Sequence, residues 1–524
     1  MDWDVFPEGN SSFVLNTSNQ AEYIYSLVNY TCVLTFPFEE KGIYGLNVTN
    51  DACSNVWTII QPKSQYIPII FVTLAIALSL IIWKLLKKAW NSNMMSSCHQ
   101  RNTTRTDLEN DLGNVTSPTE GTGPLSSRPR QRERVRALDT FRGISIALMI
   151  FVNYGGGGYG IFEHSAWNGL TVADLVFPWF AWIMGVSASL SLRSQLRNTT
   201  SRKRLFVRIL RRSVLLLLLG VALNTIGGYR NGVYDIRIPG VLQRLCLSYL
   251  AVASIEAALM KPQRLAINGI WMCVEDVLEC WQQWAIIVGV AVGHVCLTFL
   301  LHVPHCPTGY LGPGGLSDLG RNENCTGGAA GYIDRVVLGQ RHLYQNPTCH
   351  KTYHTKVPYD PEGILGTMNT VLIVFLGVQA GRILMTYGNS LSRMLRWFLW
   401  SVITGLAAGF LCSFSKEGGL IPVNKNLWSL SYVLCSASTA FLLLMLLFYA
   451  VDVRKWWLGR PFSYAGLNPL LLYVGHCLTK GMFPWFWEPV VNSHAELLSM
   501  NVWATALWLL ISFCLSHYNL RVSL

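Results

Sequence analysis

Long apolar stretches recur along the chain and are separated by polar segments. A transmembrane helix needs about 20 mostly apolar residues, and stretches of that length predict an all-α polytopic membrane protein of about eleven transmembrane helices. The predicted spans cover residues 67–86, 142–160, 171–192, 206–226, 240–260, 282–301, 363–385, 394–412, 427–451, 464–481 and 500–518.

The basic residues indicate how these spans are oriented. The segment after the first span is rich in Lys and Arg, whereas residues 1–66 hold only Lys41 and Lys63. Because cytoplasmic loops carry an excess of Lys and Arg, we expect a non-cytoplasmic N-terminus. With eleven spans, the C-terminus is then cytoplasmic, and the long loop 302–362 lies in a lumen or outside the cell.

Composition agrees with residence in a bilayer. Hydrophobic residues make up 51% of the chain and charged residues 13%, about half the charged share of an ordinary soluble protein. Much of the excess behind the net charge of +12 lies in segments predicted to be cytoplasmic, which indicates topology-setting residues. We therefore expect the lipid bilayer, and no nucleic acid, as a partner.

Four segments differ in character. Residues 1–66 carry N-glycosylation sequons and alternating stretches, and predict a small glycosylated lumenal segment with β-strands. Residues 67–86 form the first transmembrane helix, and residues 87–137, rich in small and polar residues, predict a disordered cytoplasmic linker. Residues 138–524 predict a ten-helix bundle without an internal repeat. No cleavable signal is visible, so either the first span is its own signal anchor or the sequence lacks an upstream segment.

The cysteines on the predicted oxidising side suggest two disulfides. We expect Cys32 to pair with Cys53, and Cys306 with Cys325. No CxxC pattern or His/Cys spacing of the zinc type occurs in the sequence, so we expect no metal.

Polar residues inside or at the ends of apolar spans are the candidate functional residues, because each is costly in hydrocarbon and usually faces a cavity or a partner. A helix rises about 1.5 Å per residue, so Arg142 and Asn153 would lie roughly 16 Å apart along one helix. This suits an elongated ligand with an anionic head near Arg142 and a reactive tail near Asn153. Gly155 and Gly156 would let the backbone approach such a ligand closely.

His164 follows soon after these glycines, and an imidazole can give or take a proton near neutral pH. A structural interpretation stands beside the catalytic one, since a histidine in a membrane is often a satisfied packing group. Asp174 has a structural interpretation too, as an ion-pair partner of Arg237 or Arg244.

Several long strings carry a resemblance to a known family. They include DTFRG at 139–143, FVNYGGG at 151–157, WNGLTVADLVFPWF at 167–180 and IPVNKNLWSLSY at 421–432, with others at 237–244, 306–315, 325–335 and 359–366. From residue 138 onward the chain resembles the transmembrane acyltransferase family whose lysosomal members acetylate the terminal glucosamine of heparan sulfate.

This resemblance implies an enzyme of the lysosomal membrane. It would take the acetyl group from cytosolic acetyl-CoA to the terminal glucosamine amine of heparan sulfate in the lumen. The active-site histidine of the family falls on His164 and its asparagine on Asn153. His164 would act as general base, and Asn153 would stabilise the thioester oxygen or hold His164 in the required tautomer.

The remaining candidates divide between the two substrates. Arg142, Gly155 and Gly156 are expected to bind acetyl-CoA, with Arg142 on its phosphates. Sulfated sugar is expected to contact Asn168, Asp174, Arg237, Lys425 and Asn426. A covalent acetyl-histidine step and a homodimer both remain open.

Two alternative functions stay in view. One is a proton-coupled polytopic transporter of a small anionic solute, against which the missing repeat symmetry argues. The other is a membrane acyltransferase with a different acceptor.

Overall fold

The computed structural model gives two compact units, which we describe separately: one within residues 1–131 and 492–498, the other within 132–491 and 499–524. The structure describes residues 11–16, 21–23, 36–38, 43–48, 56–61, 66–79, 81–82, 85–86, 135–197, 201–226, 236–261, 274–416, 418–490 and 493–521.

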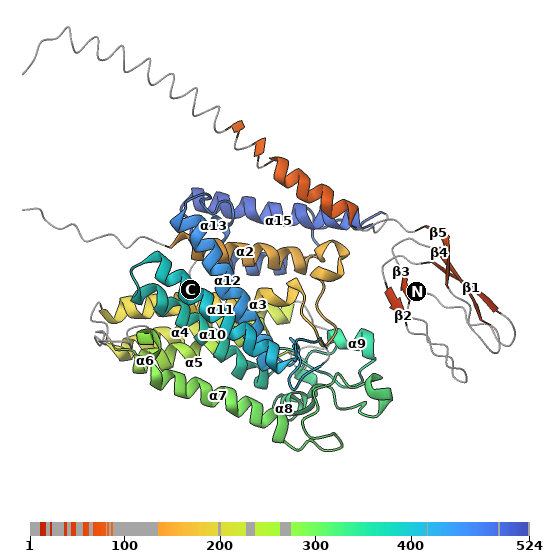
Figure 1. The fold of residues 1–524 in the computed structure, drawn as a ribbon, viewed down its shortest axis with the longest axis horizontal. Coiled ribbons are helices and arrows are strands. Elements are labelled where there is room, and N and C mark those ends of the chain that lie inside the picture. The colour runs from red at the N-terminus through yellow and green to blue at the C-terminus, as the bar shows by residue number, and fades with distance from the viewer. Residues whose placement is uncertain are drawn as a thin grey trace, which may run out of the picture. The chain divides into compact units, whose positions relative to one another are not determined.

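The first unit contains two small antiparallel sheets (Figure 1). One has the order β1 (Ser11–Asn16), β4 (Ile43–Val48), β5 (Trp57–Ile60), and the other pairs β2 (Ala21–Tyr23) with β3 (Phe36–Phe38). The predicted β-strand character of residues 1–66 is thus present. The predicted Cys32–Cys53 disulfide and nearly all of the linker 87–137 lie outside the described residues.

The second unit is helical (Figure 1). Its helices are α2 (Arg136–Asn153), α3 (Val172–Arg197), α4 (Arg202–Ile226), α5 (Val241–Leu259), α6 (Glu275–Leu278), α7 (Trp281–Leu300), α8 (Gly328–Leu338), α9 (Thr348–Tyr353), α10 (Ile364–Thr386), α11 (Ser390–Leu411), α12 (Leu430–Leu447), α13 (Phe462–Ala465) and α14 (Pro469–Leu478), with most of α15 (His494–His517).

Seven helices among the described residues are long and apolar enough to cross a bilayer: α3, α5, α7, α10, α11, α12 with its π-helical extension to Val453, and α15. The chain is therefore a mostly helical, multi-pass membrane protein. The other four predicted spans overlap α2, α4, α14 and a helix over Ile67–Ser79.

Two predicted spans have different ends from those expected. The helix predicted over 142–160 ends at Asn153, because Gly155 to Gly158 all adopt positive φ angles, which a right-handed helix does not accommodate. The helix predicted over 464–481 is broken into α13 and α14. Pro469 starts α14, where its missing N–H costs no hydrogen bond.

Helix α10 forms the centre of the second unit and packs against α3, α5, α7 and α12. Two glycines bring α3 and α10 into backbone contact. A Cβ on Gly377 would lie 1.9 Å from the carbonyl oxygen of Trp182, and one on Gly185 would lie 1.9 Å from that of Val374. Small residues at such crossings are typical of membrane helix packing.

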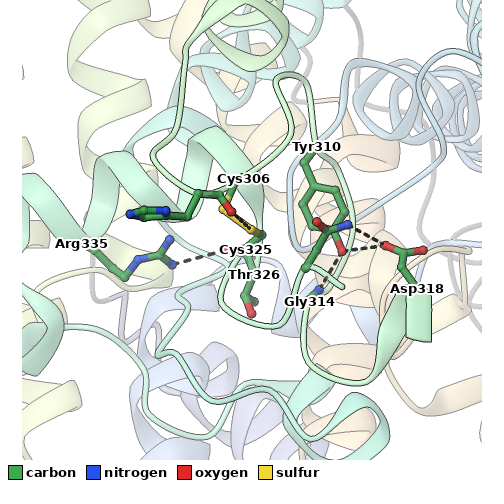
Figure 2. The surroundings of a disulfide bond; sticks show 9 residues. Cys306, Tyr310, Gly314, Asp318, Cys325, Thr326 and Arg335 are labelled. Carbon is green, nitrogen blue, oxygen red and sulfur yellow. Dashed lines mark hydrogen bonds between the residues drawn. A yellow bond between two sulfur atoms is a disulfide. The ribbon is translucent and has the colours of Figure 1, made fainter. Parts of the chain in front are cut away.

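The loop 302–362 is an ordered structure that contains α8, α9 and a disulfide. Figure 2 shows the bond between Cys306 and Cys325, whose Cα atoms lie 5.7 Å apart, so this predicted pair is confirmed. Beside it, the hydroxyl of Tyr310 accepts a hydrogen bond from the backbone N–H of Gly314 and donates one to Asp318 (Figure 2). The disulfide joins two cysteines 19 positions apart in the sequence and so restricts the unfolded chain.

Candidate active site

His164 and Asp174 form the polar pair at the start of α3. Nδ1 of His164 lies 2.8 Å from Oδ1 of Asp174. The Asp174 side chain is fully buried, whereas that of His164 is 36% exposed. Nε2 of His164 makes no hydrogen bond to any residue that the structure describes. The imidazole therefore has one nitrogen held by the protein and the other available to a ligand.

The carboxylate of Asp174 is fixed by the local sequence. Its Oδ2 atom accepts hydrogen bonds from the backbone N–H of Thr171 at 3.2 Å, the hydroxyl of Thr171 at 3.0 Å and the backbone N–H of Ser165 at 3.3 Å. An acidic residue three positions after Thr that bonds back to its N–H is the arrangement of a capping box. The same bonds that start α3 therefore aim Oδ1 at His164.

Lys425 completes this cluster from the loop between α11 and α12. Its Nζ atom lies 2.9 Å from Nδ1 of His164 and 3.3 Å from Oδ1 of Asp174. Burial lowers the pKa of Lys425, while Asp174 and Glu362 act in the opposite direction. Nδ1 can serve only one neighbour at a time, because it donates to Asp174 when protonated and accepts from Lys425 when it is not.

Asn168 and Asn426 join the two chain segments that carry these residues. The side chain of Asn424 donates to Oδ1 of Asn168 at 3.0 Å, and the side chain of Asn426 donates to the carbonyl of Ala166 at 3.3 Å. The hydroxyl of Tyr359 donates to the carbonyl of Asn426 at 2.6 Å. These contacts give Asn168 and Asn426 a structural role beside His164.

Asn153 lies at the end of α2, where its Nδ2 atom is 2.9 Å from Nε2 of His476 on α14. The expectation that Asn153 holds His164 by a hydrogen bond is therefore wrong, since its side-chain partner is His476. Gly155 and Gly156 turn the chain back after Asn153. As a result the ring of Phe162 packs edge-on against that of Phe151, with the ring centroids 5.0 Å apart. A Cβ on Gly156 would lie 2.5 Å from that of Phe162. The turn thus returns the chain toward the end of α2 just before His164.

Arg142 lines a cavity of about 290 Å³ bounded by α2, α3, α4, α5 and α14. The guanidinium donates to Oγ of Ser187 at 2.7 Å and to the carbonyl of Gly466 at 3.0 Å, and it pairs with Asp139 at 3.3 Å. Most of the other lining residues are apolar; they include Ile146, Met149, Phe177, Phe180, Leu242, Leu467 and Pro469. Arg212 and Tyr473 add polar groups. An apolar cavity with a few fixed polar groups is typical of a small-molecule site.

Arg237 lies in a separate ion cluster. It donates twice to Asp360, at 2.8 and 2.7 Å, and once to Glu362 at 2.6 Å. Although burial alone would lower the pKa of Arg237, these carboxylates raise it. The proposed pairing of Asp174 with Arg237 or Arg244 is therefore wrong: Arg244 instead donates to the carbonyls of Pro361 and Gly363.

The sequence interpretation missed the Asp174 and Lys425 contacts with His164 and the contact between His476 and Asn153. The motif Thr171-Val-Ala-Asp174 was a visible signal for the first, because it is a capping box at the start of an apolar run. Lys425 and His476 are far along the chain from their partners, and no local pattern could have joined them. Among the described residues, no group of three or more His, Cys, Asp or Glu side chains could hold a metal ion.

Comparison with known proteins identifies relatives across nearly the whole chain. The human heparan-alpha-glucosaminide N-acetyltransferase is 44% identical over 512 residues, which are 92% of this chain and 76% of the human protein. The mouse protein of the same name is 43% identical over 508 residues, with the same coverage. No protein-family model matches the chain. The identity and coverage of these two relatives show that the chain belongs to the heparan-alpha-glucosaminide N-acetyltransferase family.

Proposed function

We propose that this protein transfers the acetyl group of acetyl-CoA to the terminal glucosamine amine of heparan sulfate. The names of its relatives support the reaction. The observation that carries the mechanism is the His164–Asp174 pair, in which Asp174 holds Nδ1 and leaves Nε2 open to a ligand. A histidine oriented by a buried carboxylate is the arrangement of a general base.

The cavity beside Arg142 is the proposed binding site of acetyl-CoA. The guanidinium of Arg142 can contact a phosphate group, since its planar donors match phosphate oxygens. The apolar wall formed by α2 and α3 can cover the uncharged arm of the coenzyme. Met149 lines this cavity, and Asn153 lies one helical turn beyond it, so the thioester end of the ligand would approach Asn153. The turn at Gly155 and Gly156 would lie beside it.

The chemical step follows from the protonation of the acceptor. In an acidic lumen the glucosamine amine is mostly protonated, and an ammonium ion cannot attack a thioester. Nε2 of His164 takes one proton from the ammonium group and releases it to the lumenal solvent, and the neutral amine nitrogen then attacks the thioester carbonyl. As the C–N bond forms, His164 takes a second proton from the same nitrogen; the C–S bond breaks, and that proton passes from His164 to the departing coenzyme A sulfur. The amide of Asn153 donates a hydrogen bond to the carbonyl oxygen as negative charge develops.

This scheme is a direct transfer within a ternary complex. A covalent acetyl-histidine would require His164 to attack the thioester first. The two routes differ in their kinetics, since only the covalent route transfers radioactive acetyl to the enzyme in the absence of acceptor.

Recognition of the sulfated sugar remains a prediction for Asn168, Asp174, Arg237, Lys425 and Asn426. Their contacts divide the group. Asp174 and Lys425 contact His164 directly. Asn168, Asn426 and Arg237 instead bond to other parts of the protein, which gives them structural roles. We therefore propose that Lys425 acts on His164 and Asp174 beside the bound acceptor, and does not itself bind the sulfate groups of the sugar.

We also propose that the protein lies in the lysosomal membrane, with a lumenal N-terminus and a cytoplasmic C-terminus. The basic residues of the predicted cytoplasmic segments support this orientation. It places the Arg142 end of α2 toward the cytoplasm, where acetyl-CoA is made, and Asn153 toward the lumen. We further propose that the protein forms a homodimer.

Membranes that contain the full chain, incubated with acetyl-labelled acetyl-CoA and a saccharide ending in glucosamine, provide the test. Formation of labelled N-acetylglucosamine ends is the expected result. Uptake of a small anionic solute into sealed vesicles without any acetylated product would favour a transporter. Acetylation of a peptide or another amino sugar in preference to the glucosamine end would indicate a different acceptor.

A further inference from the structure

His476 is a buried histidine outside the His164–Asp174 pair. It lies in the last turn of α14 and is 2% exposed. Its Nδ1 atom is 3.1 Å from the carbonyl oxygen of Leu472, and its Nε2 atom is 2.9 Å from Nδ2 of Asn153. The thiol of Cys477 approaches the same Nε2 atom at 3.7 Å. Both ring nitrogens therefore have protein neighbours.

These neighbours fix the tautomer of His476. A carbonyl oxygen can only accept a hydrogen bond, so Nδ1 must carry the hydrogen. In the neutral ring, Nε2 then presents a lone pair and accepts from the amide of Asn153. The opposite amide orientation would place Oδ1 of Asn153 against that lone pair, which is repulsive. The contact thus determines which end of the Asn153 amide faces α14.

Only one hydrogen of the Asn153 amide is used in this way. Asn153 is partly exposed, and it makes no other side-chain hydrogen bond to the residues that the structure describes. Its second N–H and its Oδ1 atom therefore remain available to a ligand. An N–H donor on an amide that is already held in place can stabilise a developing oxyanion, because the amide does not have to reorient during the reaction.

The position of His476 connects this amide to the cavity. Tyr473 lines the cavity with Arg142, and its ring packs against that of His476 with centroids 5.4 Å apart. On α2, Asn153 lies one turn beyond the lining residue Met149. Both helices therefore lead from the cavity to the Asn153–His476 contact.

A second set of bonds clamps the ends of α2 and α14 together. The hydroxyl of Tyr154 shares a hydrogen bond with Thr479 at 3.0 Å, lies 3.4 Å from the carbonyl oxygen of His476 and accepts from the indole of Trp508 at 3.1 Å. This clamp holds the backbone near His476 without touching the Asn153 amide. It offers a control that separates packing of the two helices from orientation of the amide.

We propose that His476 is a positioning residue for acetyl transfer. It accepts one N–H of Asn153 at Nε2 and thereby aims the other N–H at the thioester oxygen of bound acetyl-CoA. The proposal rests on the proposed function and deepens it by assigning how Asn153 is oriented. His476 itself does not contact the substrates, and it neither takes nor gives a proton during the reaction.

The test uses the full-length protein in lipid nanodiscs, with kcat and KM measured for acetyl transfer from acetyl-CoA to a glucosamine-terminated saccharide. His476→Ala should lower kcat at least tenfold and change the KM for acetyl-CoA less than threefold. His476→Gln, whose side-chain oxygen can accept the same N–H, should recover at least a fifth of the wild-type kcat. Its pH profile should match that of the wild type.

Asn153→Ala and the double variant complete the design. Because His476 acts through Asn153, the double variant should be no slower than Asn153→Ala alone. Tyr154→Phe, which removes the clamp hydroxyl, should stay within threefold of the wild-type kcat. Thermal unfolding midpoints and acetyl-CoA binding by calorimetry identify any variant that has failed to fold. If His476→Ala is such a variant, the kcat of His476→Gln decides whether His476 positions Asn153.

The outcomes separate failure of the positioning role of His476 from failure of the proposed function. Losses that multiply in the double variant, a His476→Gln variant as slow as His476→Ala, or a Tyr154→Phe variant equally impaired would overturn the positioning role while leaving the proposed function intact. A shifted pH profile in His476→Gln would overturn it in favour of proton transfer by His476. An inactive wild-type protein would refute the proposed function and the positioning role with it.

Discussion

The imidazole of His164 lies with Nδ1 2.8 Å from Oδ1 of Asp174, a carboxylate that is entirely buried. This contact links the turn after α2 to the first turn of α3. It separates the two nitrogens of the imidazole into one that the protein holds and one that a substrate can reach.

Replacing Asp174 by Asn should slow turnover. The amide can still accept from Thr171, but its NH₂ group can face Nδ1 of His164 and favour the tautomer with hydrogen on Nε2, which cannot act as a base. We expect kcat to fall by roughly 10²- to 10³-fold, with the KM for acetyl-CoA nearly unchanged. Steady-state kinetics with Asp318→Asn, a change at an exposed carboxylate, as control would check this. A kcat within twofold of wild type would refute the orienting role.

Lys425 should affect turnover more than acceptor binding. Its Nζ atom pairs with Asp174 at 3.3 Å and lies 2.9 Å from Nδ1 of His164, so Lys425→Gln removes the positive charge beside the buried carboxylate. We expect a lower kcat and an acceptor KM within threefold of wild type. Lys416→Gln, an exposed lysine in the same loop, is the matched control. An acceptor KM raised more than tenfold at unchanged kcat would instead assign Lys425 to sugar recognition.

Arg142 should act on the donor substrate. A charge-assisted hydrogen bond to phosphate contributes about 1.5–3 kcal/mol, so Arg142→Gln should raise the KM for acetyl-CoA by at least tenfold. Arg142→Lys should recover only part of the affinity, because an ammonium cannot reproduce the planar contacts with Ser187 and Gly466. Arg211→Gln, an exposed change on α4, serves as control. Unchanged donor KM in Arg142→Gln would place the phosphates elsewhere.

The ordered loop 302–362 should be more stable in acid. Burial, together with the nearby Asp360, raises the pKa of Asp334 from 3.8 to about 7, against the opposing hydrogen bond from the N–H of Ile364. Between about pH 4 and 7 the folded protein therefore holds a proton that the unfolded chain releases. Its free energy of unfolding should fall as pH rises through this window and level off above pH 7.

Thermal unfolding in nanodiscs at pH 5 and pH 7.5 tests this. The wild-type midpoint should drop by several degrees between the two, and Asp334→Asn, which keeps the acceptor for Ile364, should reduce that drop. Asp318→Asn should behave like the wild type. An unchanged pH dependence in Asp334→Asn would contradict the assignment.

The sequence predicted the helical membrane class well, because apolar length alone determines which segments can cross a bilayer. It predicted the wrong ends where backbone geometry decides. Nothing in the hydropathy of residues 154–160 indicates that Gly155 to Gly158 all take positive φ angles and end α2. Likewise, the break before Pro469 interrupts a segment that is apolar throughout.

The sequence singled out candidate residues for the site but not their contacts. His164, Asn153 and Asp174 stood out because polar groups are costly in an apolar segment. Their partners depend on how distant helices pack, so the pairing of Asp174 with His164 in place of Arg237, and of Asn153 with His476, became visible only in three dimensions.

The most direct test of the central claim compares the wild type with His164→Gln in nanodiscs by the initial rate of acetyl transfer to a glucosamine-terminated saccharide. Calorimetry first checks that both proteins bind acetyl-CoA with the same affinity. With His164 as the base that deprotonates the amine, the variant should lose at least 100-fold in rate while binding acetyl-CoA normally. Equal rates in the two proteins would show that another group removes the proton.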